Sequence, residues 1–447
     1  MLKIKSSQPL WLKFLPKTLA LKFINKKELV AVINNSAWLL FDKLVRLLLG
    51  LLVSAWVARY LGPAQFGELS YVLAYLAFFQ TVSILGMDGI IVRDIARDNN
   101  KAGEILGTAF VLRLAVGTVC WLIAVGGMII VNGWQDRSVY ITALAGAILI
   151  FQAVDTIDLW FQSQSQSRRT VIAKLFSYFI SNGIKVALIL SKAPLIAFAV
   201  VVALESLISA IALIYAYRKF PCDNSWVYLK KKASEIINES WPFILSGLSI
   251  ATYMRIDQIM IKEFLTDADL GIYAAVLPLA TLWSFIPVTL SVSLAPLVAR
   301  KKQQGENEYW GCLSNIFRIF VMQAWIISIP IALLSNTIVN ILLGQEYRGG
   351  TIILSIVVFS NVFISMGVAQ SLWILNERKS KISLYRTVIG AVVCVVSNLI
   401  MIPKLGITGA AISALLAQAF SSFLANFMLC RRIFYMQFFS LFLMKFK

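Results

Sequence analysis

The sequence predicts an all-α polytopic membrane protein of about twelve transmembrane helices, arranged as two six-helix bundles around a central cavity. Composition is the first observation: 59% of the 447 residues are hydrophobic, only 14% are charged, and the mean hydropathy is +0.79. These values lie far outside the averages of soluble domains. A series of long apolar stretches is the second observation. The third is a regular alternation of lysine and arginine between those stretches.

Each apolar stretch is long enough to cross a bilayer as a helix. A helix rises 1.5 Å per residue, so about 20 residues cross the hydrocarbon core. Twelve stretches meet this length, and the predicted spans are 36–58, 69–91, 105–131, 139–161, 172–190, 195–216, 241–261, 271–298, 312–334, 351–375, 383–402 and 407–429.

Positive charge predicts the orientation of these spans. Seven lysines precede the first span, the successive loops then hold alternately few and many cations, and four cations lie in the tail. Cytoplasmic loops retain Lys and Arg, so the cation-rich side is predicted to be inside. The prediction is a multi-pass protein of a bacterial inner membrane with both termini in the cytoplasm. Orientation and anionic lipid headgroups explain the net charge of +19, so no nucleic-acid partner is expected.

The chain contains a weak internal repeat. Residues 59–67, which read Arg-Tyr-Leu-Gly-Pro-Ala-Gln-Phe-Gly, align without gaps on residues 263–271 at an offset of 204. Six spans separate the copies, so both halves have the same orientation and are expected to be related by an axis along the membrane normal. Such an arrangement predicts a substrate cavity between the halves.

The repeat and the basic segments together predict five parts. These are a basic amphipathic cytoplasmic N-terminal segment (1–35), a first six-helix bundle (36–216), a cytoplasmic linker (217–240), a second six-helix bundle (241–429) and a basic amphipathic cytoplasmic tail (430–447).

Cations inside the spans are candidates for binding a substrate. An ionisable group is costly within a bilayer and usually faces a bundle interior, water or a partner of opposite charge. Arg46, Arg255 and Lys185 lie well inside their spans, and we expect them to line a cationic cavity unless they form structural ion pairs. Arg113 and Arg318 lie nearer the cytoplasmic end, where they either serve the cavity or reach the interface.

Two further cations and one local pair have simpler interpretations. Lys174 and Arg386 lie within about one turn of the inner surface, where a long side chain reaches the headgroups easily. Asp42 and Arg46 are spaced i, i+4, so they share a helix face and are predicted to form a structural ion pair.

Carboxylates are the only side chains left for proton chemistry, because the chain contains no histidine. This absence excludes Ser-His-Asp and Cys-His catalysis and His-ligated metals, and no cofactor or metal is expected. No P-loop sequence is present, which excludes direct ATP hydrolysis. Glu205, near the middle of its span, is the first candidate for an ion-coupling site and Asp257 the second. The alternative for Glu205 is an ion pair with Lys185.

Several local sequences resemble a known family. The run Asp42-Lys43-Leu44-Val45-Arg46, the later Tyr60-Leu61-Gly62-Pro63 and Phe66-Gly67, and Met254-Arg255-Ile256-Asp257-Gln258 resemble Wzx-type O-antigen/polysaccharide flippases. The twelve-span layout is similar to that of the larger multidrug/oligosaccharidyl-lipid/polysaccharide (MOP) exporter superfamily.

This resemblance implies a non-enzymatic flippase. Its expected substrate is an undecaprenyl-pyrophosphate-linked oligosaccharide, moved from the cytoplasmic to the periplasmic leaflet by alternating access for polysaccharide, O-antigen and lipopolysaccharide biosynthesis. The other expected partners are membrane lipids, a proton or sodium counter-ion, and polysaccharide polymerase or chain-length machinery.

Three alternatives stay open. A multidrug antiporter of the same superfamily would need a cavity dominated by carboxylates, whereas cations outnumber carboxylates in these spans. A peptidoglycan-precursor flippase would be expected to have additional spans. A membrane polysaccharide polymerase or ligase would be expected to have a sizeable external loop, and the longest here is about 335–350.

Overall fold

The computed structural model describes residues 27–220 and 225–444, and every regular element within these ranges is helical. Most of the predicted N-terminal segment 1–35 lies outside the described residues, as do 221–224 of the predicted linker and 445–447 of the tail. The described part therefore confirms the all-α fold class.

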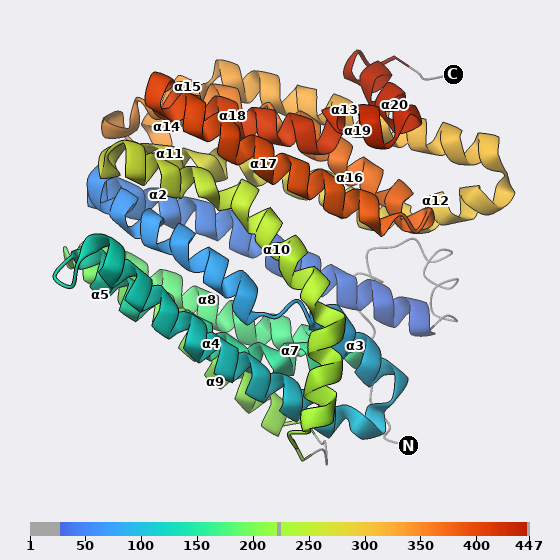
Figure 1. The fold of residues 1–447 in the computed structure, drawn as a ribbon, viewed down its shortest axis with the longest axis horizontal. Helices are drawn as coiled ribbons and strands as arrows, with labels where there is room; N and C mark the ends of the chain where they lie inside the picture. Colours follow the sequence, from blue (N-terminus) through green and yellow to red (C-terminus); the bar gives the residue numbers. More distant parts are fainter. Residues whose placement is uncertain (1–26, 221–224, 445–447) are drawn as a thin grey trace, which may run out of the picture.

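The helices form two bundles joined by α10 (Figure 1). The first bundle contains α2 (Lys27–Ser83), α3 (Asp88–Arg97), α4 (Ala102–Asn132), α5 (Arg137–Ala145), α6 (Ile148–Phe151), η3 (Gln152–Asp155), α7 (Thr156–Ser163), α8 (Ser167–Leu190) and α9 (Leu195–Arg218). After α10 (Lys230–Phe264), the second bundle contains α11 (Asp267–Thr281), η4 (Leu282–Ser284), α12 (Phe285–Gln304), α13 (Glu306–Leu333), α14 (Ser335–Leu342), α15 (Gly350–Val357), α16 (Ser360–Asn376), α17 (Ser380–Leu405), α18 (Ile407–Ala419), η6 (Phe420–Leu424), α19 (Asn426–Leu429) and α20 (Arg431–Leu441).

Ten helical segments of the described part are long and apolar enough to cross a membrane. One of them, Phe41–Arg97, is 57 residues long and contains most of the first predicted span and all of the second. Helix α10 contains the predicted span 241–261 but is not among the ten. Twelve crossings therefore stay a prediction.

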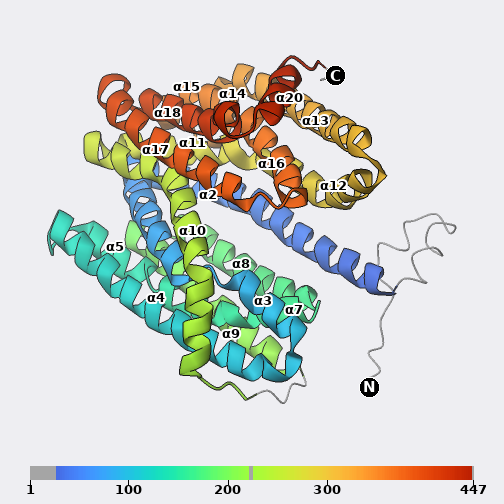
Figure 2. The ribbon, with the colours of Figure 1, turned by 45° about the vertical axis from the view of Figure 1, so that its right-hand side comes forward.

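Helix α2 consists of two arms that meet at Gly62. This residue has φ 73° and ψ 168°, a conformation that only glycine adopts readily, and Pro63 follows it. The two arms return from this bend toward the same end of the molecule and diverge along the way, so the first two predicted spans form an open V (Figures 1 and 2).

The two bundles are in closest contact where α2 meets α11. A methyl group on Gly67 would lie 1.8 Å from the carbonyl oxygen of Asp267, and one on Gly271 would lie 1.8 Å from that of Pro63. Only glycine at both positions permits this approach of the backbones. Nearby, the Tyr347 hydroxyl donates to the carbonyl oxygen of Ala58 over 2.6 Å. We call this region the Gly67 end; the cation count predicts that it is periplasmic.

The opposite end of the molecule, at α3, is called here the Arg93 end. The first arm of α2 and helix α12 diverge toward this end, leaving the bundles joined mainly by α10 (Figure 2). The structure is therefore closed between the bundles at the Gly67 end and more open at the Arg93 end.

Helix α10 crosses from one bundle to the other. It begins at Lys230, so residues 230–240, predicted as linker, form its first turns. Ile236 is buried in a hydrophobic cluster of the first bundle. Arg93 Nη1 donates to Glu239 Oε1 over 2.5 Å, and Lys232 Nζ to Asp94 Oδ2 over 3.1 Å. The later turns of α10 contact α17 and α18 of the second bundle.

The C-terminal helix α20 is also part of the fold. Ile433 and Met436 are buried against α13 and α16 in a cluster of the second bundle. Gln437 is buried too, and its Nε2 donates to the carbonyl oxygen of Ser422 over 2.9 Å. One face of the predicted amphipathic tail thus packs on protein, and Arg431 and Arg432 lie on its exposed face.

Candidate functional site: a polar cavity in the first bundle

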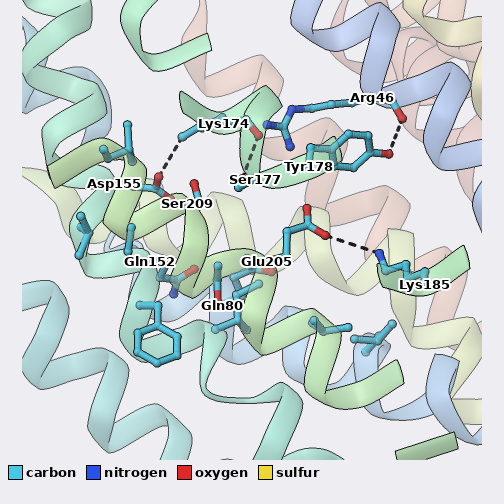
Figure 3. Close-up of a pocket in the computed structure, with 18 residues that line it drawn as sticks. Arg46, Gln80, Gln152, Asp155, Lys174, Ser177, Tyr178, Lys185, Glu205 and Ser209 are labelled. Atoms are coloured by element: carbon cyan, nitrogen blue, oxygen red, sulfur yellow. Dashed lines mark hydrogen bonds and ion pairs between the residues drawn. The ribbon is translucent and has the colours of Figure 1, made fainter. Parts of the chain in front are cut away.

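A cavity of about 470 Å³ lies inside the first bundle, between α2, α6, η3, α8 and α9. Its lining is rich in charged, amide and hydroxyl groups, and Figure 3 shows these groups converging from separate helices. Gln80 enters from α2 and Gln152 from η3, while Ser206 and Ser209 enter from α9. The cavity can therefore offer many hydrogen bonds to a polar ligand.

Helix α8 supplies one wall as a polar stripe. Lys174, Ser177, Tyr178 and Lys185 all line the cavity. Ser177, Tyr178 and Lys185 follow Lys174 by three, four and eleven residues, and these spacings place all four on one helix face. The other faces of α8 carry apolar residues such as Phe176 and Phe179, which are exposed on the outside of the bundle.

Arg46 is the cation that α2 contributes to this wall. Its Nε donates to Asp42 Oδ1 over 2.8 Å, and its guanidinium lies over the Tyr178 ring, 4.8 Å from the centroid. The Tyr178 hydroxyl in turn donates to the main-chain oxygen of Arg46 over 2.8 Å. Arg46 Nη2 is buried and has no hydrogen-bond partner in the described part of the chain. An unsatisfied charged donor beside a cavity suggests a ligand that accepts from it.

Lys174 is held by two carboxylates. Its Nζ lies 2.9 Å from Asp155 Oδ1 and 2.8 Å from Asp158 Oδ2. Its depth in the predicted span indicated that this lysine reaches the membrane surface, whereas in the structure two carboxylates of η3 and α7 hold it on the cavity wall. Asp155 keeps 42% of its side chain exposed, so part of the carboxylate faces the cavity.

Lys185 and Glu205 form a looser pair. Lys185 Nζ lies 3.5 Å from Glu205 Oε2, which also accepts a 2.7 Å hydrogen bond from the Ser181 hydroxyl. The Glu205 side chain is 26% exposed. The alternative of a pair with Lys185, named from sequence, is what the structure shows. Glu205 is thus neither isolated nor fully buried.

The other three cationic candidates do not line this cavity. Arg113 is buried and forms an ion pair with Asp88. Arg255 is exposed and Arg318 is half-buried, and within residues 27–220 and 225–444 neither forms an ion pair or a side-chain hydrogen bond. Of the five cations predicted to line one central cavity, Arg46 and Lys185 line the cavity inside the first bundle. A substrate role for the other three stays a prediction.

Asp257 is the more deeply buried of the two coupling candidates. Only 3% of it is exposed, its Oδ2 accepts a 2.5 Å hydrogen bond from Tyr273, and its Oδ1 accepts from the N–H of Gln258. It forms no ion pair with any described residue. Depth counted along the sequence made Glu205 the first candidate for the ion-coupling site, whereas burial in the structure makes Asp257 the first candidate.

A second hollow of about 710 Å³ separates the bundles between the first arm of α2 and α11, η4 and α12. Leucine, valine, proline and phenylalanine side chains dominate its lining, and its two cations, Lys43 and Arg46, both come from α2. We call it the interbundle groove. Arg46 lines both the polar cavity and this apolar groove.

Sequence reasoning missed Tyr178 and the serines of α8 and α9. The signal was the spacing of Lys174, Ser177, Tyr178 and Lys185, which indicates a polar face on one helix. Which helix that face meets could not be read from spacing. In the described part, no group of three His, Cys, Asp or Glu side chains is placed to hold a metal ion.

Comparisons with known proteins identify the family of the chain. The family model described as "Polysaccharide biosynthesis protein" matches residues 32–302. The probable low-salt glycan biosynthesis flippase of Haloferax volcanii is 24% identical over 383 residues, which cover 82% of this chain and 77% of that protein.

Two solved structures share the fold. An inward-facing multidrug resistance transporter of the MATE family, in the MOP superfamily, superimposes with a TM-score of 0.73 at 15% identity, covering 88% of this chain and 95% of that one. The lipid II flippase MurJ, in an inward closed conformation, gives a TM-score of 0.68 at 13% identity, covering 92% and 91%. The chain therefore belongs to the polysaccharide biosynthesis protein family.

Proposed function

We propose that this protein is a flippase for an undecaprenyl-pyrophosphate-linked oligosaccharide. The observation that carries the proposal is the position of Arg46, which borders a polar cavity on one side and an apolar groove on the other. A lipid-linked glycan has the same order of parts: polar sugars, a dense anion and a hydrocarbon tail. The flippase function, inner-membrane location and cytoplasmic termini are parts of one proposal, and the protein carries out no covalent reaction.

Each part of this substrate has chemically matched neighbours. Sugar hydroxyls meet the amides of Gln80 and Gln152 and the hydroxyls of the α8 and α9 serines. The pyrophosphate meets Arg46, whose planar guanidinium suits two phosphate oxygens at once, with Lys43 beside it on α2. The polyprenyl tail lies in the interbundle groove and continues into lipid.

The contacts between the bundles support an alternating-access mechanism. They are closed at the Gly67 end by the backbone contact of Gly67 with Asp267 and of Gly271 with Pro63. The described state therefore receives substrate from the Arg93 end, which the cation count predicts to be cytoplasmic. Opening the Gly67 contact and closing the groove would release the glycan on the other side.

A second candidate is export of a cationic small molecule, as in a multidrug antiporter of the same superfamily. Asp155 and Glu205 on the cavity wall are the observation that favours it. The apolar groove beside Arg46 and the polysaccharide family favour the lipid-linked glycan. A lipid II-type precursor shares the pyrophosphate and tail, and it differs only in the group that enters the polar cavity.

Transport into proteoliposomes tests the proposal. The purified full-length protein is reconstituted with a polyprenyl-pyrophosphate trisaccharide or, separately, with a fluorescent lipophilic cation. Protein-dependent movement of the trisaccharide between leaflets, measured by its accessibility to a membrane-impermeant oxidant, supports the flippase. Movement of the cation alone would overturn this proposal and support the antiporter.

A further inference from the structure

The polar cavity does not share the positive charge of the chain as a whole. Arg46, Lys174 and Lys185 are the three cations that line it. Four carboxylates are ion-paired with them: Asp155 and Glu205, which also line the cavity, and Asp42 and Asp158, which do not. This cluster of three cations and four carboxylates has a net formal charge of −1, whereas the chain carries +19.

The positive groups in this cluster are largely neutralised. Lys174 Nζ lies within 2.9 Å of one carboxylate and 2.8 Å of another, and Lys185 Nζ lies 3.5 Å from Glu205. Arg46 differs, because its Nε is paired while Nη2 has no partner within the described residues. Arg46 also stands where the polar cavity meets the interbundle groove. Among the three cations that line the polar cavity, Arg46 thus has an available donor, and it is placed for the pyrophosphate.

The acceptors that face the sugar part are carboxylates and neutral groups. Asp155 uses Oδ1, and Glu205 uses Oε2, for their partners. Their other oxygens accept no hydrogen bond from any described residue, and both side chains are partly exposed at the cavity. Figure 3 shows Asp155 and Glu205 entering the space from different helices, with Gln80 and Gln152 beside them. Beyond Arg46, a ligand therefore meets carboxylate oxygens, amides and hydroxyls.

On the basis of the proposed function, we infer that the glycan carried by this protein is neutral or bears amino groups, and that uronic and other acidic sugars are excluded. A carboxylate on the glycan would approach Asp155 and Glu205 without a free cation to receive it, and like charges brought together disfavour binding. Sugar hydroxyls and a protonated amine would both find acceptors there.

Three matched probes test this selectivity. Each is a polyprenyl-pyrophosphate trisaccharide, and they differ only in the terminal sugar: a hexose, the corresponding hexuronic acid, or the corresponding 2-amino-2-deoxyhexose. Each probe is reconstituted with the full-length protein without an imposed ion gradient. We expect the neutral and amino probes to move at similar rates, and the acidic probe to move at about one tenth of that rate or below it.

A double variant makes the cause specific. Asp155→Asn with Glu205→Gln changes the cluster charge from −1 to +1, so the ratio of acidic to neutral rates should rise by about fivefold or more. Using a ratio within one variant removes any change in overall rate. Asp98→Asn with Glu104→Gln is the matched control, because it removes half-buried Asp98 and exposed Glu104, two carboxylates outside the cavity, and its ratio should stay that of the wild type.

The possible outcomes distinguish a failure of the inferred sugar selectivity from a failure of the proposed flippase function. If wild type moves the acidic probe as fast as the neutral one, the inferred selectivity is wrong while the flippase function stands. An unchanged ratio in a well-folded double variant, judged by a single symmetric gel-filtration peak, also overturns it. If the wild type moves none of the probes, the proposed function itself fails.

Discussion

Gly67 and Gly271 occupy equivalent positions of the internal repeat and pack against each other, so that a methyl group on either would lie within 3.0 Å of the other's main-chain nitrogen. The contact is reciprocal in a second way, since Gly67 approaches Asp267 and Gly271 approaches Pro63, which are also separated by 204 residues. The contact therefore has the two-fold symmetry expected where a pseudo-symmetry axis passes between the bundles.

Substituting Gly67 by alanine should weaken this contact. The new methyl group would collide with the main chain of α11, which cannot rotate away, so overpacking should cost about 1–3 kcal/mol. We expect a lower thermal unfolding midpoint in detergent and greater labelling of a cysteine placed at Ser70. Gly126→Ala is the control, because nothing lies within 4 Å of a methyl group there. Equal midpoints for the two variants would contradict the described packing.

Arg46→Ala should reduce translocation of the lipid-linked trisaccharide by about 100-fold, because the charge-assisted hydrogen bonds to the pyrophosphate are lost. Arg46→Lys should recover part of the rate, since it keeps the charge and loses the planar fork. Asp42→Asn breaks the local ion pair but keeps the guanidinium, and it should retain most of the activity. Arg97→Ala, an exposed arginine on α3, is the control. Transport by Arg46→Ala at the wild-type rate would remove Arg46 from the site.

Reversing one charge of the Arg93 and Glu239 pair should slow transport about two- to fivefold, because the contact is partly exposed to solvent. Glu239→Arg combined with Arg93→Glu should restore the rate. The hydrogen bond from Arg93 holds the pKa of Glu239 below its ordinary value. The pair is therefore complete at neutral pH and contributes until the pH falls through that lowered pKa. If the double reversal is no better than the single ones, the two residues do not act as a pair.

Asp257→Asn should abolish the response of flux to an imposed proton or sodium gradient while leaving substrate binding in place. Asp257 is buried without an ion-pair partner among the described residues, whereas Glu205 is already paired with Lys185. Glu205→Gln in the same assay compares the two candidates. Gradient dependence that survives in both variants would reject carboxylate coupling at these sites, and downstream consumption of the product would then be the expected drive.

The spacing of residues along one helix correctly predicted one ion pair of the site. Asp42 and Arg46 are four residues apart on one helix, and the structure joins them over 2.8 Å. The alignment at an offset of 204 likewise indicated that residues 59–67 and 263–271 are related. Neither pattern states which surfaces meet, because a repeat has the same sequence signature whether its copies touch or lie apart.

The cavity depends on contacts between distant segments, and these set the limit of prediction. Lys174 was expected at the membrane surface, because its depth in the span was known and its neighbours on α7 and η3 were not. The charge of the cavity was predicted from a count over all spans, which included Arg113, Arg255 and Arg318. Only tertiary packing shows that these three lie elsewhere and that four carboxylates surround the three cations that remain.

Helix α10 determines how this polypeptide can be divided. Its first turns complete the hydrophobic cluster that contains Leu106 and Ile236, and the N–H of Val227 donates to the carbonyl oxygen of Gly103. A gene cut between α9 and α10 would leave that cluster uncovered in the first fragment and give the second a helix whose apolar face has no partner. Co-expressed fragments should therefore be stable only when they associate. The half of the chain defined by the sequence repeat is not a unit that folds alone, because the first bundle needs the first turns of α10.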